Sequence, residues 1–155
     1  MDTVRRLLAA APTYRFTHAC VVPVPRAEVR ERLLDLEHYP DWWHQVRAVA
    51  RIDDDNALVV CRSVLPYDLE LYLRAVRRDE GLLEVAIDGP IAGWARWHLD
   101  DAGPGRTRLA FEQQVQTRSR LLTVASYLAR PLLVWNHARM MRGAEQGLAG
   151  SAPLS

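Results

Sequence analysis

The sequence predicts an α+β fold in which a curved, seven-stranded antiparallel sheet wraps around one long C-terminal helix. Three observations predict it: an aromatic and β-branched segment at residues 14–22, six further strand-like segments between residues 46 and 117, and a helical pattern from 119 to about 148. Two short helices are expected after the first strand. Because one helix cannot fill the whole concave face of such a sheet, we expect a central hydrophobic cavity.

Length and composition limit the kind of protein this is. The chain has 155 residues, which suits one domain, with 49% apolar residues and a formal net charge of +1. That charge gives no reason to expect nucleic acid as a partner, and no stretch reaches the roughly 20 apolar residues of a membrane span. Cys20 and Cys61 match neither a disulfide framework nor a metal-ligand spacing. We therefore expect a cytoplasmic monomer or homodimer without metal, cofactor or stable membrane insertion.

The first strand, at residues 14–22, follows residues 1–13, which we interpret as a short helix or an extension. Pro25 ends this strand and suits the first turn of a helix, because a proline has no N–H to donate. The side chains that share the inward face of the strand are Tyr14, Phe16, His18, Cys20 and Val22.

Two short helices are expected next. Val29, Leu33 and Leu36 recur at helical spacing, and Pro40 is expected to end this first helix. The segment 41–44 then predicts a helix cap followed by one or two helical turns. Its two tryptophans are expected to anchor the short helices on the sheet rather than to bind a ligand.

The remaining strands are expected to form a meander whose breaks carry turn-forming Gly, Pro, Asp and Asn residues. Leu83, Val85 and Ile87 alternate with polar residues, as in a sheet with one buried and one solvated face. The predicted strands are 46–53, 57–65, 68–78, 82–88, 91–100 and 106–117.

The C-terminal helix is expected to kink at Pro131. Leu133, Met140 and Ala144 define its apolar face after the kink. Residues 150–155 are expected to form a disordered tail. The residues expected to point away from the apolar face are Arg139, Arg142, Glu145 and Gln146.

Polar side chains on otherwise apolar faces are the candidate site residues. His18 and Gln113 lie among apolar side chains on their strands. Asn136 and His137 border the apolar face of the C-terminal helix. A buried polar group needs a partner, either another protein group or a ligand. Pairing within the protein is the simpler alternative for each residue, whereas convergence of all four on one cavity favours a binding pocket.

Three residues are candidates for catalysis: His18, Arg62 and His137. His18 is the best acid–base candidate because a histidine titrates near neutral pH, although no carboxylate can be assigned as its partner. Arg62 would stabilise an oxyanion or donate a proton if it points inward, and its orientation remains open. Cys20 is interpreted as a small buried hydrophobe rather than a nucleophile. The residues expected to line the cavity are Tyr14, Phe16, Cys20, Tyr67, Leu71, Trp97, Phe111, Gln113, Leu133, Asn136 and Met140.

Several short motifs follow one another along the chain: Tyr14-Arg-Phe16, Val24-Pro-Arg-Ala-Glu-Val29, Tyr39-Pro-Asp-Trp-Trp43, Leu65-Pro-Tyr-Asp-Leu69, Trp97-His-Leu99 and Gly105-Arg-Thr-Arg-Leu109. Their order and spacing resemble START-like (SRPBCC) proteins of the polyketide cyclase/dehydrase type. The segment 131–148 is similar to the terminal helix of one actinobacterial branch. The resemblance spans about residues 14 to 149. It implies a helix-grip fold with a deep cavity for lipids, polyketides or other hydrophobic ligands.

The resemblance leaves the activity open, because this superfamily holds cyclases, dehydratases, carriers, receptors and co-chaperones. The first hypothesis is a biosynthetic enzyme similar to polyketide cyclases or aromatases, with lyase or isomerase chemistry, that promotes cyclisation or dehydration by enclosure and acid–base assistance. The alternative is a non-catalytic carrier or sensor of a lipid-like molecule, and a third is an interaction module that uses Trp135. This branch often has a small polar and a bulky aromatic residue where the chain has His18 and Cys20, which would open space and add an acid–base group.

Overall fold

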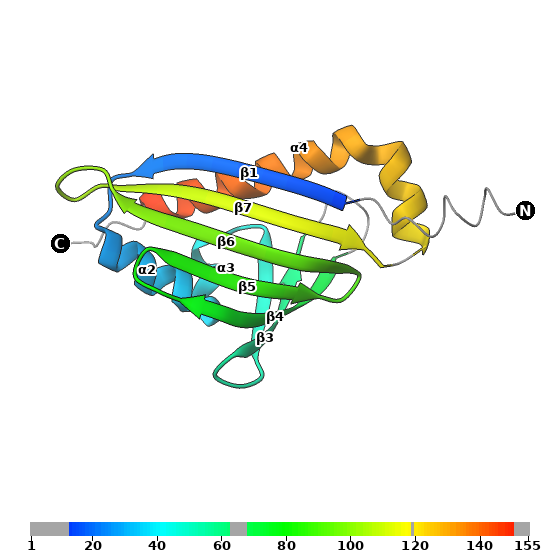
Figure 1. The fold of residues 1–155 in the computed structure, drawn as a ribbon, viewed down its shortest axis with the longest axis horizontal. Coiled ribbons are helices and arrows are strands. Elements are labelled where there is room, and N and C mark those ends of the chain that lie inside the picture. Colours follow the sequence, from blue (N-terminus) through cyan, green and yellow to red (C-terminus); the bar gives the residue numbers. More distant parts are fainter. Residues whose placement is uncertain (1–12, 63–67, 119, 151–155) are drawn as a thin grey trace, which may run out of the picture.

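One curved sheet grips a long C-terminal helix, as the sequence predicts (Figure 1). The computed structural model describes residues 13–62, 68–118 and 120–150, with side chains from residue 130 onward in the last range. In chain order the elements are β1 (Thr13–Val22), α2 (Arg26–Leu34), the 3-10 helix η1 (Leu36–His38), α3 (Tyr39–Trp42), β2 (Val46–Arg51), β3 (Asn56–Cys61), β4 (Leu69–Arg78), β5 (Leu82–Asp88), β6 (Ile91–Asp101), β7 (Thr107–Thr117) and α4 (Arg120–Gly150).

The seven strands form one antiparallel sheet in the order β1-β7-β6-β5-β4-β3-β2. Strands β2 to β7 therefore form a meander, and β1 pairs with β7 at the far edge. In this last pair, Phe16 lies opposite Gln113 and His18 lies opposite Phe111. Helix α4 runs along β1, while α2 and α3 lie at one end of the sheet (Figure 1). The predicted topology is confirmed. Most strand bounds agree closely with those expected, but β3 ends at Cys61 rather than at residue 65, and residues 63–65 lie outside the described residues.

The prediction that Pro40 ends the first short helix is wrong. Helix α2 ends at Leu34, and the 3-10 turn η1 follows it. Pro40 instead lies in the first turn of α3, which begins at Tyr39 and ends at Trp42 rather than spanning 41–44. A proline fits there because the first N–H groups of a helix have no intrahelical acceptor.

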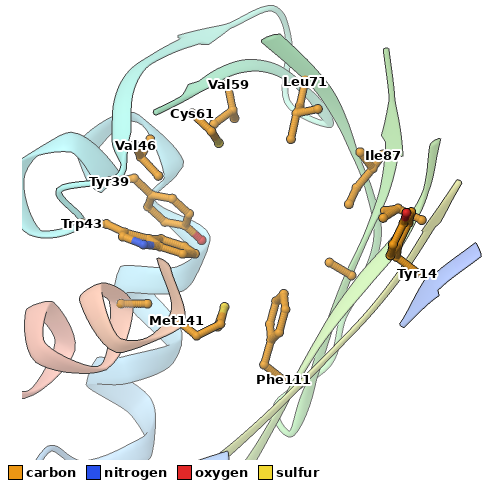
Figure 2. Packing of buried hydrophobic residues seen from close by; sticks show 13 residues of the cluster. Tyr14, Tyr39, Trp43, Val46, Val59, Cys61, Leu71, Ile87, Phe111 and Met141 are labelled. Atoms are coloured by element: carbon orange, nitrogen blue, oxygen red, sulfur yellow. The ribbon is translucent and has the colours of Figure 1, made fainter. Parts of the chain in front are cut away.

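Two clusters of buried side chains lie under the sheet. One fills the end where β1 leads into α2, and its fully buried members include Val22, Leu99, Leu109 and Leu148. The other surrounds an open centre, as Figure 2 shows. One end of the domain is therefore filled and the other is hollow, which is the expected outcome of covering a wide sheet with one helix.

Helix α4 contains Pro131, and its first turns run at an angle to the rest of the helix (Figure 1). A bend at a proline is expected because the residue lacks an N–H and its ring clashes with the preceding turn. Trp135 is 47% exposed, and the neighbouring Leu132 and Val134 are exposed as well. None of the described helices has the combination of length and hydropathy needed to cross a membrane.

The inward face of α4 is turned slightly from its predicted position. Ala144 is fully buried, as expected, and Met140 is half-buried. Met141 and Leu148 are almost completely buried as well, so the centre of the face lies closer to Met141 than predicted. The prediction that Glu145 points away is therefore wrong: it follows Met141 by one helical turn and faces β1.

Gly147 allows α4 to contact α3 directly. A Cβ built at Gly147 would lie 1.9 Å from the Trp42 carbonyl oxygen, so the helices must separate to hold any side chain there. We expect Gly147→Ala to lower the free energy of unfolding by about 1–3 kcal/mol, the range typical of overpacked sites, as measured by chemical denaturation. Gly150→Ala is a control in the same helix, because a Cβ there meets nothing within 4 Å. Equal stability of the two variants would contradict this packing.

Candidate functional site

A cavity of about 350 Å³ lies between the sheet and the short helices. Its walls are mainly apolar and come from the inner faces of the strands, from α3 and from α4 (Figure 2). Cavities of about 300–1,000 Å³ are typical of small-molecule sites. The lining residues labelled in Figure 2 are Tyr39, Trp43, Val46, Val59, Cys61, Leu71, Ile87 and Phe111.

The structure brings only part of the predicted lining to this cavity. The predicted residues that line it are Leu71, Trp97, Phe111, Gln113 and Met140. Tyr67 lies outside the described residues. The predicted residues that lie outside the described lining are Tyr14, Phe16, Cys20, Leu133 and Asn136. All of these belong to β1 or α4, whose inner faces pack against each other.

Two aromatic residues of the lining, Tyr39 and Trp43, were missed by the sequence analysis. Trp43 does act as an anchor on the sheet, where its ring meets Trp97 of β6 edge-on at 6.5 Å between centroids. It also anchors α4, because its indole Nε1 donates to the Met140 carbonyl at 2.9 Å. The Tyr39 hydroxyl donates to the Leu33 carbonyl, and burial raises the pKa of Tyr39. The signal that predicts their shared orientation is the i, i+4 spacing of the two rings.

The rim at one end of the cavity is charged. Glu37 comes from η1, and Arg51 and Asp54 come from β2 and the turn that follows it. Arg51 pairs with Asp54, and Arg78 donates to Asp55 at 2.8 Å. Exposed ion pairs of this kind contribute little stability, so their rearrangement is inexpensive. This end of the cavity is therefore charged, whereas the rest of the lining is mainly apolar.

Gln113 supplies a polar side chain to the otherwise apolar inner end of the cavity. Its Oε1 lies 2.9 Å from Nε2 of His137. An amide oxygen only accepts, so Nε2 of His137 carries the proton and donates it in this bond. The imidazole ring is held in place by stacking on Phe16, with centroids 4.0 Å apart and planes 10° from parallel. The Gln113 amide nitrogen has no hydrogen-bond acceptor among the described residues.

His137 is neutral at physiological pH. Burial, and to a lesser extent the neighbouring His18, lowers its pKa to about 4. A neutral ring with one proton on Nε2 is a fixed hydrogen-bond donor rather than an acid. His137 therefore orients the Gln113 amide, and it reaches the cavity only through that amide.

His18 faces inward as predicted, but its partner lies on α4. Its Nε2 is 3.0 Å from Oε2 of Glu145, a residue 127 positions away along the chain. Cys20 lies beside this pair, and burial together with the Glu145 charge raises the pKa of its thiol to about 11. The thiol is therefore protonated at neutral pH, which agrees with its interpretation as a non-nucleophile.

The three catalytic candidates do not meet at one place. Arg62 is exposed and is absent from the described cavity lining. His18 lies between β1 and α4, also outside that lining. Of the three, His137 alone is linked to the cavity, through Gln113.

No protein-family model and no curated protein matches this sequence. Solved structures do match. The Zhui aromatase/cyclase from Streptomyces sp. R1128 aligns with a TM-score of 0.71 at 16% identity, over 90% of this chain and 93% of that chain. A START superfamily protein from Mycobacterium smegmatis aligns with a TM-score of 0.69 at 13% identity, over 88% and 94% of the two chains. A norcoclaurine synthase point mutant from Thalictrum flavum, in complex with a transition state analogue, aligns with a TM-score of 0.63 at 13% identity, over 90% and 96%. At these identities the likeness establishes the fold alone.

The burial of His137 predicts a pH-dependent stability. Its pKa of about 4 in the folded chain lies below the ordinary value of 6.5, so the unfolded chain takes up this proton first as the pH falls. The free energy of unfolding is therefore unaffected by the protonation of His137 above pH 6.5, and it decreases by up to about 3 kcal/mol as the pH falls toward 4. Denaturation curves on both sides of pH 6.5 check this, with His137→Phe as a control that keeps a ring on Phe16. The same pH dependence in both proteins would show that His137 is not its source.

Proposed function

We propose that this chain, which has the START-like helix-grip fold, encloses one hydrophobic small molecule of polyketide or lipid type and promotes its cyclisation or dehydration. The observation that carries the proposal is the oriented amide of Gln113 in a cavity with mainly apolar walls. Apolar walls supply most of the binding free energy for such a ligand, and a few placed polar groups fix its orientation.

Ring closure of a polyketone chain is the chemistry that this arrangement suits. A carbon next to one carbonyl loses a proton and bonds to a second carbonyl carbon, whose oxygen becomes negative and then takes up a proton. The Gln113 amide can donate to that oxygen, and a donor aimed at developing charge stabilises the transition state. The cavity walls hold the two ends of the chain together, which removes entropy from the barrier. Water at the open, charged rim exchanges the two protons, and later loss of water completes a dehydration.

His137 has a positioning role in this proposal. Because it is neutral and its Nε2 proton is already donated to Gln113, it fixes the amide and transfers no proton itself. Neither His18 nor Arg62 takes part, since both lie outside the described lining.

The names of the structural neighbours support an enzyme. One is an aromatase/cyclase, and another is a synthase in complex with a transition state analogue. The alternative of a non-catalytic carrier uses the same amide to hold the head group of its cargo. The two hypotheses differ in what removal of the Gln113 amide changes.

The first experiment identifies the ligand class. Gently purified protein is examined by native mass spectrometry, and any released small molecule is identified after denaturing extraction. We expect a retained acyl, isoprenoid or polyketide species, because an apolar cavity is most stable when it is filled. Release of a polar metabolite such as a nucleotide would contradict the proposed ligand class.

The second experiment tests catalysis with a substrate of the class so identified. We expect Gln113→Leu to lower kcat by about 10²- to 10³-fold, the usual effect of removing one oxyanion donor, while ligand affinity changes less than kcat. Gln114→Leu is the matched control, because it makes the same change on the opposite face of β7. Unchanged turnover in Gln113→Leu would show that the Gln113 amide has no catalytic role. Absence of turnover in the wild type, together with weaker ligand binding by Gln113→Leu, would favour the carrier.

A further inference from the structure

Three potential metal ligands lie together outside the cavity. His18 and Cys20 are two residues apart on β1, so their side chains share the inward face of the strand. Glu145 approaches them from α4, and its Oε2 lies 3.0 Å from Nε2 of His18. The ligand atoms of all three residues lie within 4.8 Å of one another.

We propose that His18, Cys20 and Glu145 bind a zinc ion. An imidazole nitrogen, a thiolate sulfur and a carboxylate oxygen are the three donor types that proteins use for Zn²⁺, and this mixed set suits Zn²⁺ better than the all-oxygen preference of Mg²⁺ or Ca²⁺. Three protein ligands leave a fourth tetrahedral position for water. The site can admit a water molecule, because the His18 and Glu145 side chains are 23% and 38% exposed.

The separations are close to those of a tetrahedral site. With zinc–ligand distances of about 2.0–2.3 Å, ligand atoms lie about 3.4–3.6 Å apart. Nε2 of His18 and Oε2 of Glu145, now 3.0 Å apart, would separate slightly to admit the ion. Sγ of Cys20 lies within 4.8 Å of both, so it would move inward by at most about 1 Å, which side-chain rotation can supply.

The Glu145 carboxylate also brings a negative charge to the cluster. A bound Zn²⁺ would replace the proton of the Cys20 thiol, which leaves to solvent, and both the thiolate and the carboxylate would then neutralise the ion. Zinc binding therefore releases a proton and requires no oxidant or reductant.

Such an ion would join the edge strand β1 to the terminal helix α4. None of its three ligands belongs to the described cavity lining, so the proposal is independent of the proposed enzymatic function. Binding to the folded chain alone would raise its stability in proportion to the logarithm of the free zinc concentration. The alternative is an ordinary His18–Glu145 hydrogen bond beside an unreactive thiol.

Cobalt absorption spectroscopy on tag-free, reduced protein tests the proposal. We expect one equivalent of Co²⁺ to produce a thiolate-to-cobalt charge-transfer band, and Zn²⁺ to displace it. Cys20→Ser should abolish the band, and His18→Gln or Glu145→Gln should weaken Co²⁺ binding by at least about tenfold, since loss of a residue that only hydrogen-bonds to a metal ligand already has an effect of that size. Cys61→Ala is the matched control that should keep the band, because Cys61 is the other free cysteine and lies outside the cluster. Absence of the band in the wild type, or its survival in Cys20→Ser, would overturn the proposal.

A measurement on the wild type alone covers the case in which a variant does not fold. Alkylation of the two thiols is followed by mass spectrometry with and without added Zn²⁺. We expect zinc to slow the alkylation of Cys20 at least about tenfold more than that of Cys61, because only a coordinated thiolate is shielded directly. Equal protection of the two cysteines, or no protection, would contradict a zinc site at Cys20.

Discussion

The whole structure depends on how one helix covers the concave face of a seven-stranded sheet. At its C-terminal end α4 lies close to the sheet, where Ala144 and Leu148 are fully buried. Gly147 brings it onto the backbone of α3, and the Trp43 indole binds the Met140 carbonyl. These contacts fix the two helices relative to each other. The volume that neither helix fills remains as the cavity.

Polar side chains gather where α4 meets the strands β1 and β7. Two pairs form there, and each joins one strand residue to one helix residue: Gln113 with His137, and His18 with Glu145. The β1–β7 register places Phe16 opposite Gln113, which is why the Phe16 ring can support His137. One pair presents an amide to the cavity. The other lies apart from it, so the two proposals concern separate places on one helix–sheet contact.

The START-like fold does not by itself distinguish an enzyme from a carrier. The proposed catalytic role depends on the way in which the Gln113 amide is held. His137 is buried and neutral, and its Nε2 proton, donated to Gln113, keeps the amide in one orientation. A donor fixed in advance needs no reorganisation when charge develops on a substrate oxygen. This preorganisation stabilises a transition state more than it stabilises a ligand that is only bound and carried.

The sequence alone determined the strands, the long helix and the inward face of β1, because alternation with period two and helical spacing are local properties. It therefore placed His18 and Gln113 on inward faces correctly. Only the tertiary structure decided what those side chains meet: Glu145, 127 residues from His18, was expected to point away. Phe16 likewise faces α4 rather than the cavity, and the neutral state of His137 follows from its burial. A periodic pattern reports that a face is buried, whereas the partner of each side chain depends on packing between segments far apart in the chain.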